Sequence, residues 1–139
     1  MSGHHTELHC YLVGYDMFVQ RFEHGNAALM EGEAFRAVFE PHVDRRDPDG
    51  SYWHISTDDG STADIYATVD CVTISRFSPG LVLDLLVKFI GLADAVVLPP
   101  GCPTLLAHEG RRRHLPEELA ADAVVVHAVS DVERVLQSC

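Results

Sequence analysis

Residues 78–100, SPGLVLDLLVKFIGLADAVVLPP, predict a long buried helix followed at once by a strand. Ser78 is a typical helix N-cap and Pro79 fits the first position of a helix, so we expect the helix over 79–95. Its polar positions form one narrow stripe, made of Asp84, Lys88 and Gly91. The remaining sides are apolar and need covering, and AVVLPP at 95–100 predicts a strand ended by two prolines.

The residues before this helix predict a three-stranded meander at 52–57, 62–68 and 71–77. Turn residues separate the three segments, and apolar and polar residues alternate within them. In the second segment, for example, Ala63 and Ile65 alternate with polar neighbours. Such alternation is typical of an antiparallel sheet with one buried face and one wetter face.

The first third of the chain predicts a strand, a short helix and an exposed loop. Aromatic and branched residues at 10–22 indicate one strand or two short ones. EAFRAVFE at 33–40 has helical apolar spacing and stops against Pro41. The following segment to residue 50 is rich in acids, prolines and glycine, which is typical of an exposed loop.

The last third predicts two further helices around a strand. A short helix is expected at 103–109 and another from Pro116. AVVVHA at 123–128 predicts a strand, and Ser130 with Glu133 three residues later forms a capping-box pattern for a final helix.

These segments together predict a single α+β domain over residues 11–139, preceded by a flexible tail at 1–10. The expected sheet is mixed but mostly antiparallel, with about five to six strands and two to four helices. A chain of 139 residues is long enough to bury one core without a metal or disulfide. Because the helix at 79–95 is apolar on nearly every side, we also expect a homodimer.

The net charge of −11 lies mainly in the first 70 residues, which hold 13 acids against four bases. Such a surface repels phosphate backbones, so nucleic acid is not an expected partner, whereas a basic protein is. No apolar tract reaches the length of a membrane span, and the N-terminus lacks the pattern of a signal peptide. We therefore expect no membrane partner and a cytoplasmic location, with four widely spaced cysteines as reduced thiols.

Cys102 is the candidate nucleophile for an enzymatic function. If Pro103 begins the short helix, Cys102 is its N-cap, where the helix dipole favours a thiolate. His108 would lie at the far end of that helix, so the general base would have to be His114, His127 or a distant residue. The alternative is a small packing residue in a rigid turn.

No metal or other cofactor is expected, because each metal-like pattern lacks a required ligand. In HEGRRRH the two histidines, His108 and His114, are six residues apart rather than four, so the zinc-protease motif fails. The loop around Asp47 and Asp49 lacks the first and twelfth ligands of an EF-hand. His5 and His9 have i, i+4 spacing, but they belong to the predicted tail.

Three consecutive arginines, Arg111 to Arg113, precede His114 and the helix expected from Pro116. Arginines beside a helix N-terminus can hold a small anionic ligand. Glu117 and Glu118 in the first turn of that helix favour the alternative, a solvated cluster of ion pairs.

Seven acids lie within residues 40–64, and Arg45 and Arg46 are the bases there. Trp53 lies in the same segment, and acids around an aromatic anchor match the rim and centre of a protein interface. The expected binding residues include Trp53 and three acids of this segment, Asp58, Asp59 and Asp64. The leading hypothesis is thus a non-enzymatic domain that binds a basic protein, and the alternatives are the Cys102 enzyme and the Arg111–His114 anion site.

The segments YDMFVQRF, DGSTADIY and LPPGCP resemble small acidic α+β proteins of high-GC bacteria that have no settled function. The resemblance implies a single small domain and assigns no catalytic residue. Small acidic bacterial proteins are often immunity or inhibitor proteins, which agrees by analogy with the leading hypothesis.

Overall fold

The computed structural model describes residues 16–68 and 71–139 as one α+β domain built on a nine-stranded sheet. The strands follow the order β3-β4-β5-β6-β1-β7-β8-β9, and β2 pairs with β1 outside this path. Every pairing is antiparallel except that of β8 with β9, which is parallel. The predicted class, a mixed and mostly antiparallel sheet in an α+β domain, is confirmed.

The strands are β1 (Met17–Glu23), β2 (Asn26–Ala28), β3 (Val43–Arg46), β4 (Tyr52–Ser56), β5 (Thr62–Ala67), β6 (Val72–Ser75), β7 (Ala95–Leu98), β8 (Leu105–Leu106) and β9 (Val124–Val125). The α-helices are α2 (Gly32–Phe39), α3 (Leu81–Ala93), α4 (Glu117–Ala120) and α5 (Val129–Ser138), and the 3₁₀ helices are η1 (Glu40–His42) and η2 (Glu109–His114).

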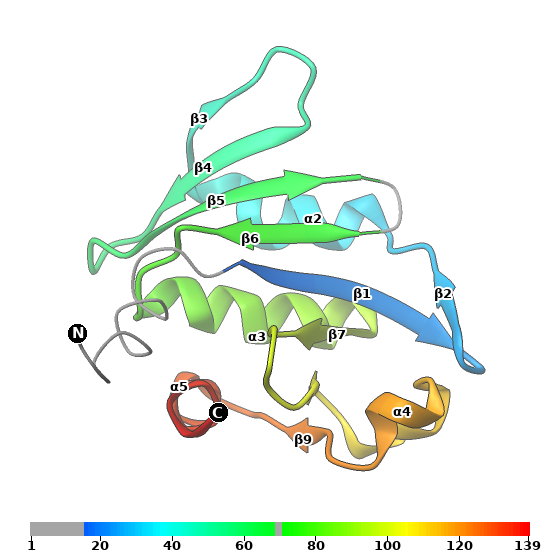
Figure 1. The fold of residues 1–139 in the computed structure, drawn as a ribbon. Helices are drawn as coiled ribbons and strands as arrows, with labels where there is room; N and C mark the ends of the chain where they lie inside the picture. The colour runs from blue at the N-terminus through cyan, green and yellow to red at the C-terminus, as the bar shows by residue number, and fades with distance from the viewer. Residues whose placement is uncertain (1–15, 69–70) are drawn as a thin grey trace.

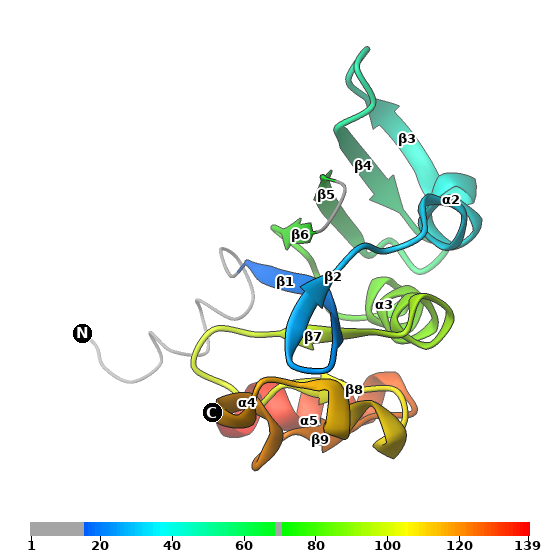
Figure 2. The same cartoon turned by 90° about the vertical axis from the view of Figure 1, so that its right-hand side faces the viewer.

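Helices α2 and α3 cover one face of the sheet, which we call the inner face (Figures 1 and 2). Alternate strand residues point to this face and form the main core with the apolar sides of both helices. They include Met17, Val19, Trp53, Ile55, Ala63, Ile65, Val72 and Ile74. Helix α5 packs against α3 and adds Val132, Val135 and Leu136 to the same core.

A second, smaller core lies at the β7–β9 end of the sheet. It is formed by Val96, Leu106, Leu115 and Ala123, with Phe22, Leu98 and Leu119 packed against them. Figure 2 shows α4, α5 and β9 gathered at this end, away from β3. The face opposite α2 and α3, called the outer face, is covered near β7 by this second core, and no helix of the described residues lies over it at β4, β5 and β6 (Figure 2).

The start of α3 differs from the prediction. The helix begins at Leu81 rather than at Pro79, and Ser78 does not cap it: the Ser78 hydroxyl accepts the Thr62 amide at 2.8 Å. The caps come from the β4–β5 turn, where Asp59 Oδ2 accepts the Leu81 amide at 3.0 Å and Ser61 Oγ accepts the Val82 amide at 3.1 Å. The Ser78–Pro79 pattern predicts a local cap, whereas the observed capping residues lie about twenty residues earlier in the chain.

The expected five to six strands were too few, because β2, β3 and β8 were not foreseen. Strand β3 lies in the predicted acidic loop, and β8 replaces the helix expected at 103–109. These three strands have two to four residues, too short to show a period of two. Each of the six predicted strands has a counterpart, although β9 is shorter than expected and residues 10–15 of the first predicted strand lie outside the described residues.

Helix α5 begins at Val129, one residue before the predicted N-cap Ser130, so the expected Ser130–Glu133 capping box is wrong. Asp131 takes the capping role instead, and its carboxylate accepts the His127 amide at 2.8 Å and the Ala128 amide at 3.2 Å. The predicted tail at 1–10 lies outside the described residues. Across the described ranges, none of the helices combines the length and the apolar character needed to span a membrane.

Candidate functional site

Three aromatic side chains form a row across the outer face of the sheet. Strand pairing places Tyr52 opposite Tyr66, Tyr66 opposite Thr73, and Thr73 opposite Phe18. The rings of Tyr52 and Tyr66 lie 5.1 Å apart, and the exposed fractions of Tyr66 and Phe18 are 41% and 39%. We call Tyr52, Tyr66 and Phe18 the aromatic row.

Asp64 lies on the same face in the neighbouring row, and its carboxylate is buried. It accepts the Tyr52 hydroxyl at 2.7 Å and Arg76 Nε at 2.6 Å. Burial raises the pKa of Asp64, but the hydrogen bonds from Tyr52 and Arg76 outweigh it and hold the pKa below its ordinary value. Asp64, a predicted binding residue, therefore orients Tyr52 rather than facing a partner.

Trp53 does not supply the expected surface anchor, because it points to the inner face and is 6% exposed. Its ring packs 4.8 Å from that of Phe35, and the Arg46 guanidinium lies 5.2 Å from its centre. The strand period explains the difference: residues 53 and 52 point to opposite faces, so Tyr52 takes the outer position.

The predicted acids Asp58 and Asp59 have different surroundings. Asp59 accepts hydrogen bonds from the hydroxyls of Thr57 and Ser61 and from the amides of Ser61 and Leu81. These bonds hold its pKa far below the ordinary value of 3.8. The carboxylate of Asp58, like that of Asp47 in the β3–β4 turn, is exposed and has no hydrogen bond or ion pair with the described residues.

Exposed carboxylates therefore lie in the turns at both ends of β4. Asp47 and Asp49 belong to the turn before Tyr52, and Asp58 belongs to the turn after Ser56. Asp49 accepts the amide and hydroxyl of Ser51, which lowers its pKa and keeps it ionised. We call Asp47, Asp49 and Asp58 the acidic rim, since they lie in the turns at the two ends of β4, the strand that carries Tyr52.

The three consecutive arginines do not converge on an open anion site. Arg111 Nη2 donates to the Phe22 carbonyl at 2.7 Å and to Glu23 Oε2 at 2.8 Å. Arg112 donates to Glu109 and to the Ala120 carbonyl, and Arg113 is exposed. Ion pairs are present as the alternative expected, but their acids are Glu23 and Glu109 rather than Glu117 and Glu118, and the Arg111 side chain is 14% exposed rather than solvated.

Glu23 and His114 connect the β1–β2 turn to the end of η2. Hydrogen bonds from Arg111 and Arg21 lower the pKa of Glu23 to about 2. His114 Nδ1 lies 3.3 Å from Glu23 Oε1 and accepts the His24 amide at 3.2 Å. Burial lowers the pKa of His114, which favours the neutral ring that this hydrogen bond requires.

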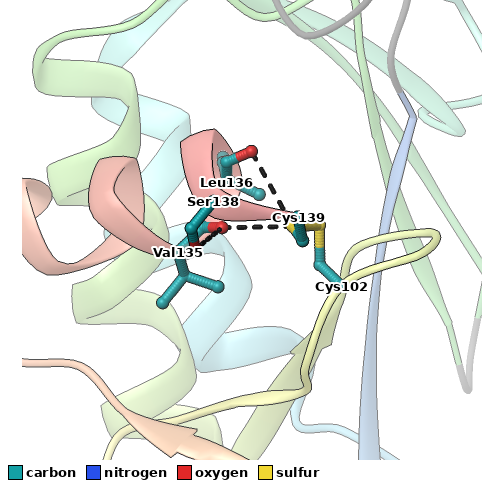
Figure 3. The surroundings of a disulfide bond; sticks show 5 residues. All are labelled: Cys102, Val135, Leu136, Ser138 and Cys139. Carbon is teal, nitrogen blue, oxygen red and sulfur yellow. Dashed lines mark hydrogen bonds between the residues drawn. A yellow bond between two sulfur atoms is a disulfide. The ribbon is translucent and has the colours of Figure 1, made fainter. Parts of the chain in front are cut away.

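Cys102 forms a disulfide with Cys139, so the predicted reduced thiols are wrong for this pair (Figure 3). The bond closes a loop of 37 residues and attaches the end of α5 to the turn after β7. Cys139 Sγ lies 3.1 Å from the Val135 carbonyl, a contact without a proton because the sulfur is oxidised. The helix expected after Cys102 is also absent, so neither the thiolate nor its N-cap position exists here.

A cavity of about 540 Å³ lies between α2 and the inner face of the sheet. Its walls are mainly apolar and include Phe35, Trp53 and Phe89, while Glu31, Arg36 and Asp49 line it with charges of both signs. Trp53 Nε1 is the buried side-chain nitrogen that finds no hydrogen-bond partner among the described residues. The volume of the cavity suits a small molecule, but because charges of both signs line it, they indicate no particular class of ligand.

Sequence reasoning missed the aromatic row and the contact of the β1–β2 turn with η2. The alternation of Tyr52 and Tyr66 with apolar residues was a usable signal for the first, but Phe18 joins the row only through the pairing of β1 with β6. Comparison with protein-family models, with curated proteins and with solved structures finds no match to this chain. Any function must therefore be argued from the geometry of the chain itself.

Proposed function

We propose that this protein is a non-enzymatic, inhibitor- or immunity-like domain that binds a basic protein on the outer face of its sheet. The observation that carries the proposal is the aromatic row, in which Tyr66 and Phe18 are exposed. Large apolar side chains at a surface mark contact sites when they gather together, and aromatic residues are enriched at interface centres.

The charge of the surrounding surface supports a basic partner. The acidic rim lies in the turns at both ends of β4, the strand of Tyr52, and Asp47 and Asp58 have no internal partner among the described residues. By contrast, Asp59 and Asp64 are engaged inside the fold, so they do not belong to the proposed binding surface. Trp53 is buried, so the aromatic centre of the proposed surface consists of Tyr52, Tyr66 and Phe18 instead.

The enzymatic alternative has no support in this structure, because the disulfide removes the Cys102 thiolate. The anion-binding alternative is weakened because Arg111 and Arg112 are occupied by internal acceptors. The cytoplasm remains the proposed compartment, but disulfides persist mainly in oxidising surroundings. A cytoplasmic form therefore requires the chain to fold with Cys102 and Cys139 reduced.

A capture experiment tests this function. The purified chain is immobilised and exposed to an extract of its source cells, beside a Phe18→Ser/Tyr66→Ser variant and a Leu81→Ser control. Leu81 is 42% exposed, which matches Phe18 and Tyr66, but it lies on α3. We expect the wild type and the control to retain the same basic protein and the double variant to lose it. Equal retention by all three would refute the proposed surface.

A further inference from the structure

The tight turn between β1 and β2 is held against the end of η2, across 90 residues of sequence. His24 and Gly25 both have positive φ, 52° and 85°, as a two-residue hairpin turn requires. The Gly25 amide donates to the His114 carbonyl at 2.9 Å, and the His24 amide donates to His114 Nδ1 at 3.2 Å. The backbone therefore brings three possible metal ligands together: Glu23, His24 and His114.

The three side chains have a spacing that suits a metal ion. One ligand atom from each lies within 4.8 Å of the other two, and Glu23 Oε1 is 3.3 Å from His114 Nδ1. Two ligands bound about 2.0–2.1 Å from a tetrahedral zinc ion are separated by about 3.3–3.4 Å. The His24 side chain is exposed, so its ring can turn to complete the third position.

Arg21 and Arg111 orient the Glu23 carboxylate through Oε2, and they leave Oε1 facing the His114 imidazole. Glu23 Oε2 accepts Arg21 Nε at 3.0 Å, Arg21 Nη2 at 2.8 Å and Arg111 Nη2 at 2.8 Å. Oε1 is left beside His114 Nδ1, which is itself an acceptor because it takes the His24 amide hydrogen. Two facing acceptors at this distance are stabilised by a cation between them. Outer hydrogen bonds of this kind commonly hold metal-ligating carboxylates in place.

The same arginines restrict which metal can bind. Because Arg21 and Arg111 occupy Glu23 Oε2, the cluster offers a single carboxylate oxygen, whereas Mg²⁺ and Ca²⁺ are held mainly by oxygen ligands. Imidazole nitrogen prefers Zn²⁺, Cu²⁺ and Ni²⁺. Two imidazoles and one carboxylate oxygen are a ligand set found in zinc sites with one open position.

We propose that Glu23, His24 and His114 form a zinc site that clamps the β1–β2 turn onto the end of η2. Zinc takes the His114 Nδ1 lone pair that accepts the His24 amide, so the His24 peptide has to move aside, while the Gly25 bond to the His114 carbonyl still joins the turn to η2. Three protein ligands leave the fourth tetrahedral position to water. The site lies at the β1–β2 turn and η2, and it is independent of the proposed binding surface.

Zinc titration by calorimetry tests the site. The full chain is used in a background in which His4, His5 and His9 are replaced by asparagine, because these histidines are alternative ligands. In this background, His24→Asn removes one imidazole but keeps a residue that tolerates positive φ. Glu23→Gln removes the carboxylate, and His108→Asn is the control, since His108 is an exposed histidine of the same segment outside the cluster.

We expect one zinc ion per chain, with affinity reduced at least about tenfold by His24→Asn and by Glu23→Gln and unchanged by His108→Asn. Nitrogen-15 NMR of the imidazoles gives a second readout that does not depend on the variants: zinc should shift the His24 and His114 signals and leave His108 unchanged. No binding at micromolar zinc, or binding that His24→Asn leaves intact without an imidazole shift, would overturn the proposal.

Discussion

The Asp59 carboxylate has no partner that the sequence predicts, yet it accepts four hydrogen bonds in the structure. Its carboxylate ties together the β4–β5 turn and the start of α3 through Thr57, Ser61 and Leu81. Gly80 completes this junction at φ 130°, where an added Cβ would lie within 2.4 Å of Asp59 Oδ2. Thr57 and Ser61 belong to the same turn as Asp59, but Leu81 is 22 residues away, so the sequence did not reveal the link to α3.

Replacing Asp59 by asparagine should lower the melting temperature by several degrees at neutral pH, because the amide group cannot accept all four hydrogen bonds. The folded-state pKa of Asp59 is far below its ordinary value of 3.8, so its stabilising effect is complete above about pH 4. The effect is lost as the pH falls from there towards the folded-state pKa. Urea unfolding of the wild type and of Asp59→Asn at several pH values measures the difference in their free energies of unfolding.

The pH dependence separates this role from a simple loss of surface charge. The difference in free energy of unfolding between wild type and Asp59→Asn should be constant from pH 7 to about pH 4 and shrink below it. A difference that disappears near neutral pH, or no difference at all, would contradict the capping role. Asp58→Asn is the matched control and should leave stability almost unchanged.

Among the elements, those with a strong internal period were predictable and those defined by partners were not. The residues of α3 and of β4 to β6 showed their buried faces in the sequence, and the structure confirms them. Strand β8 has two residues, and its pairing with β7 and β9 decides its conformation. Pro103 at the start of the 103–109 segment favours a helix locally, but strand pairing with distant residues outweighs this preference.

A disulfide attaches the end of α5 to the turn after β7, and the sequence of α5 does not predict it. Cys102 and Cys139 lie 37 residues apart, with Cα atoms 5.3 Å from each other. Sequence reasoning treated them as separate thiols because widely spaced cysteines define no pairing. The fold brings them together by packing α5 on α3.

Removing this disulfide should destabilise the chain by at most about 4 kcal/mol, the chain-entropy limit for a loop of 37 residues. Cys139→Ser and the reduced wild type should unfold at the same urea concentration, below that of the oxidised wild type. Intact-mass analysis after alkylation confirms which form is present in each sample. An unchanged midpoint on reduction would show that the disulfide does not support the fold.

For the whole molecule, neighbouring elements already cover most of α3. Its residues from Val82 to Ala93 are largely buried, but Leu92 is 64% exposed beside a groove that also includes Pro41 and Leu85. The homodimer expected from the sequence remains a proposal, and this groove between α2 and α3 is the surface that would carry it. Burial of Leu92 by a second copy would remove exposed apolar area from water.

Light scattering at micromolar protein concentration measures the assembly state. We expect the mass of two chains for the wild type and of one chain for Leu92→Glu, because a charge in the groove must be desolvated on association. Leu81→Glu is the control, since Leu81 is exposed on the same helix outside the groove residues. A wild-type mass of one chain would contradict the proposed dimer.

The proposed function requires the aromatic row and the acidic rim to bind a basic protein together. Stopped-flow association with the captured partner tests it, using wild type and an Asp47→Asn/Asp58→Asn variant that leaves Asp59 in place. Raising salt from about 50 mM to about 500 mM should slow wild-type association at least about tenfold and change dissociation little. The variant should associate more slowly at low salt and depend less on salt. Identical association rates for both proteins at every salt concentration would contradict the claim.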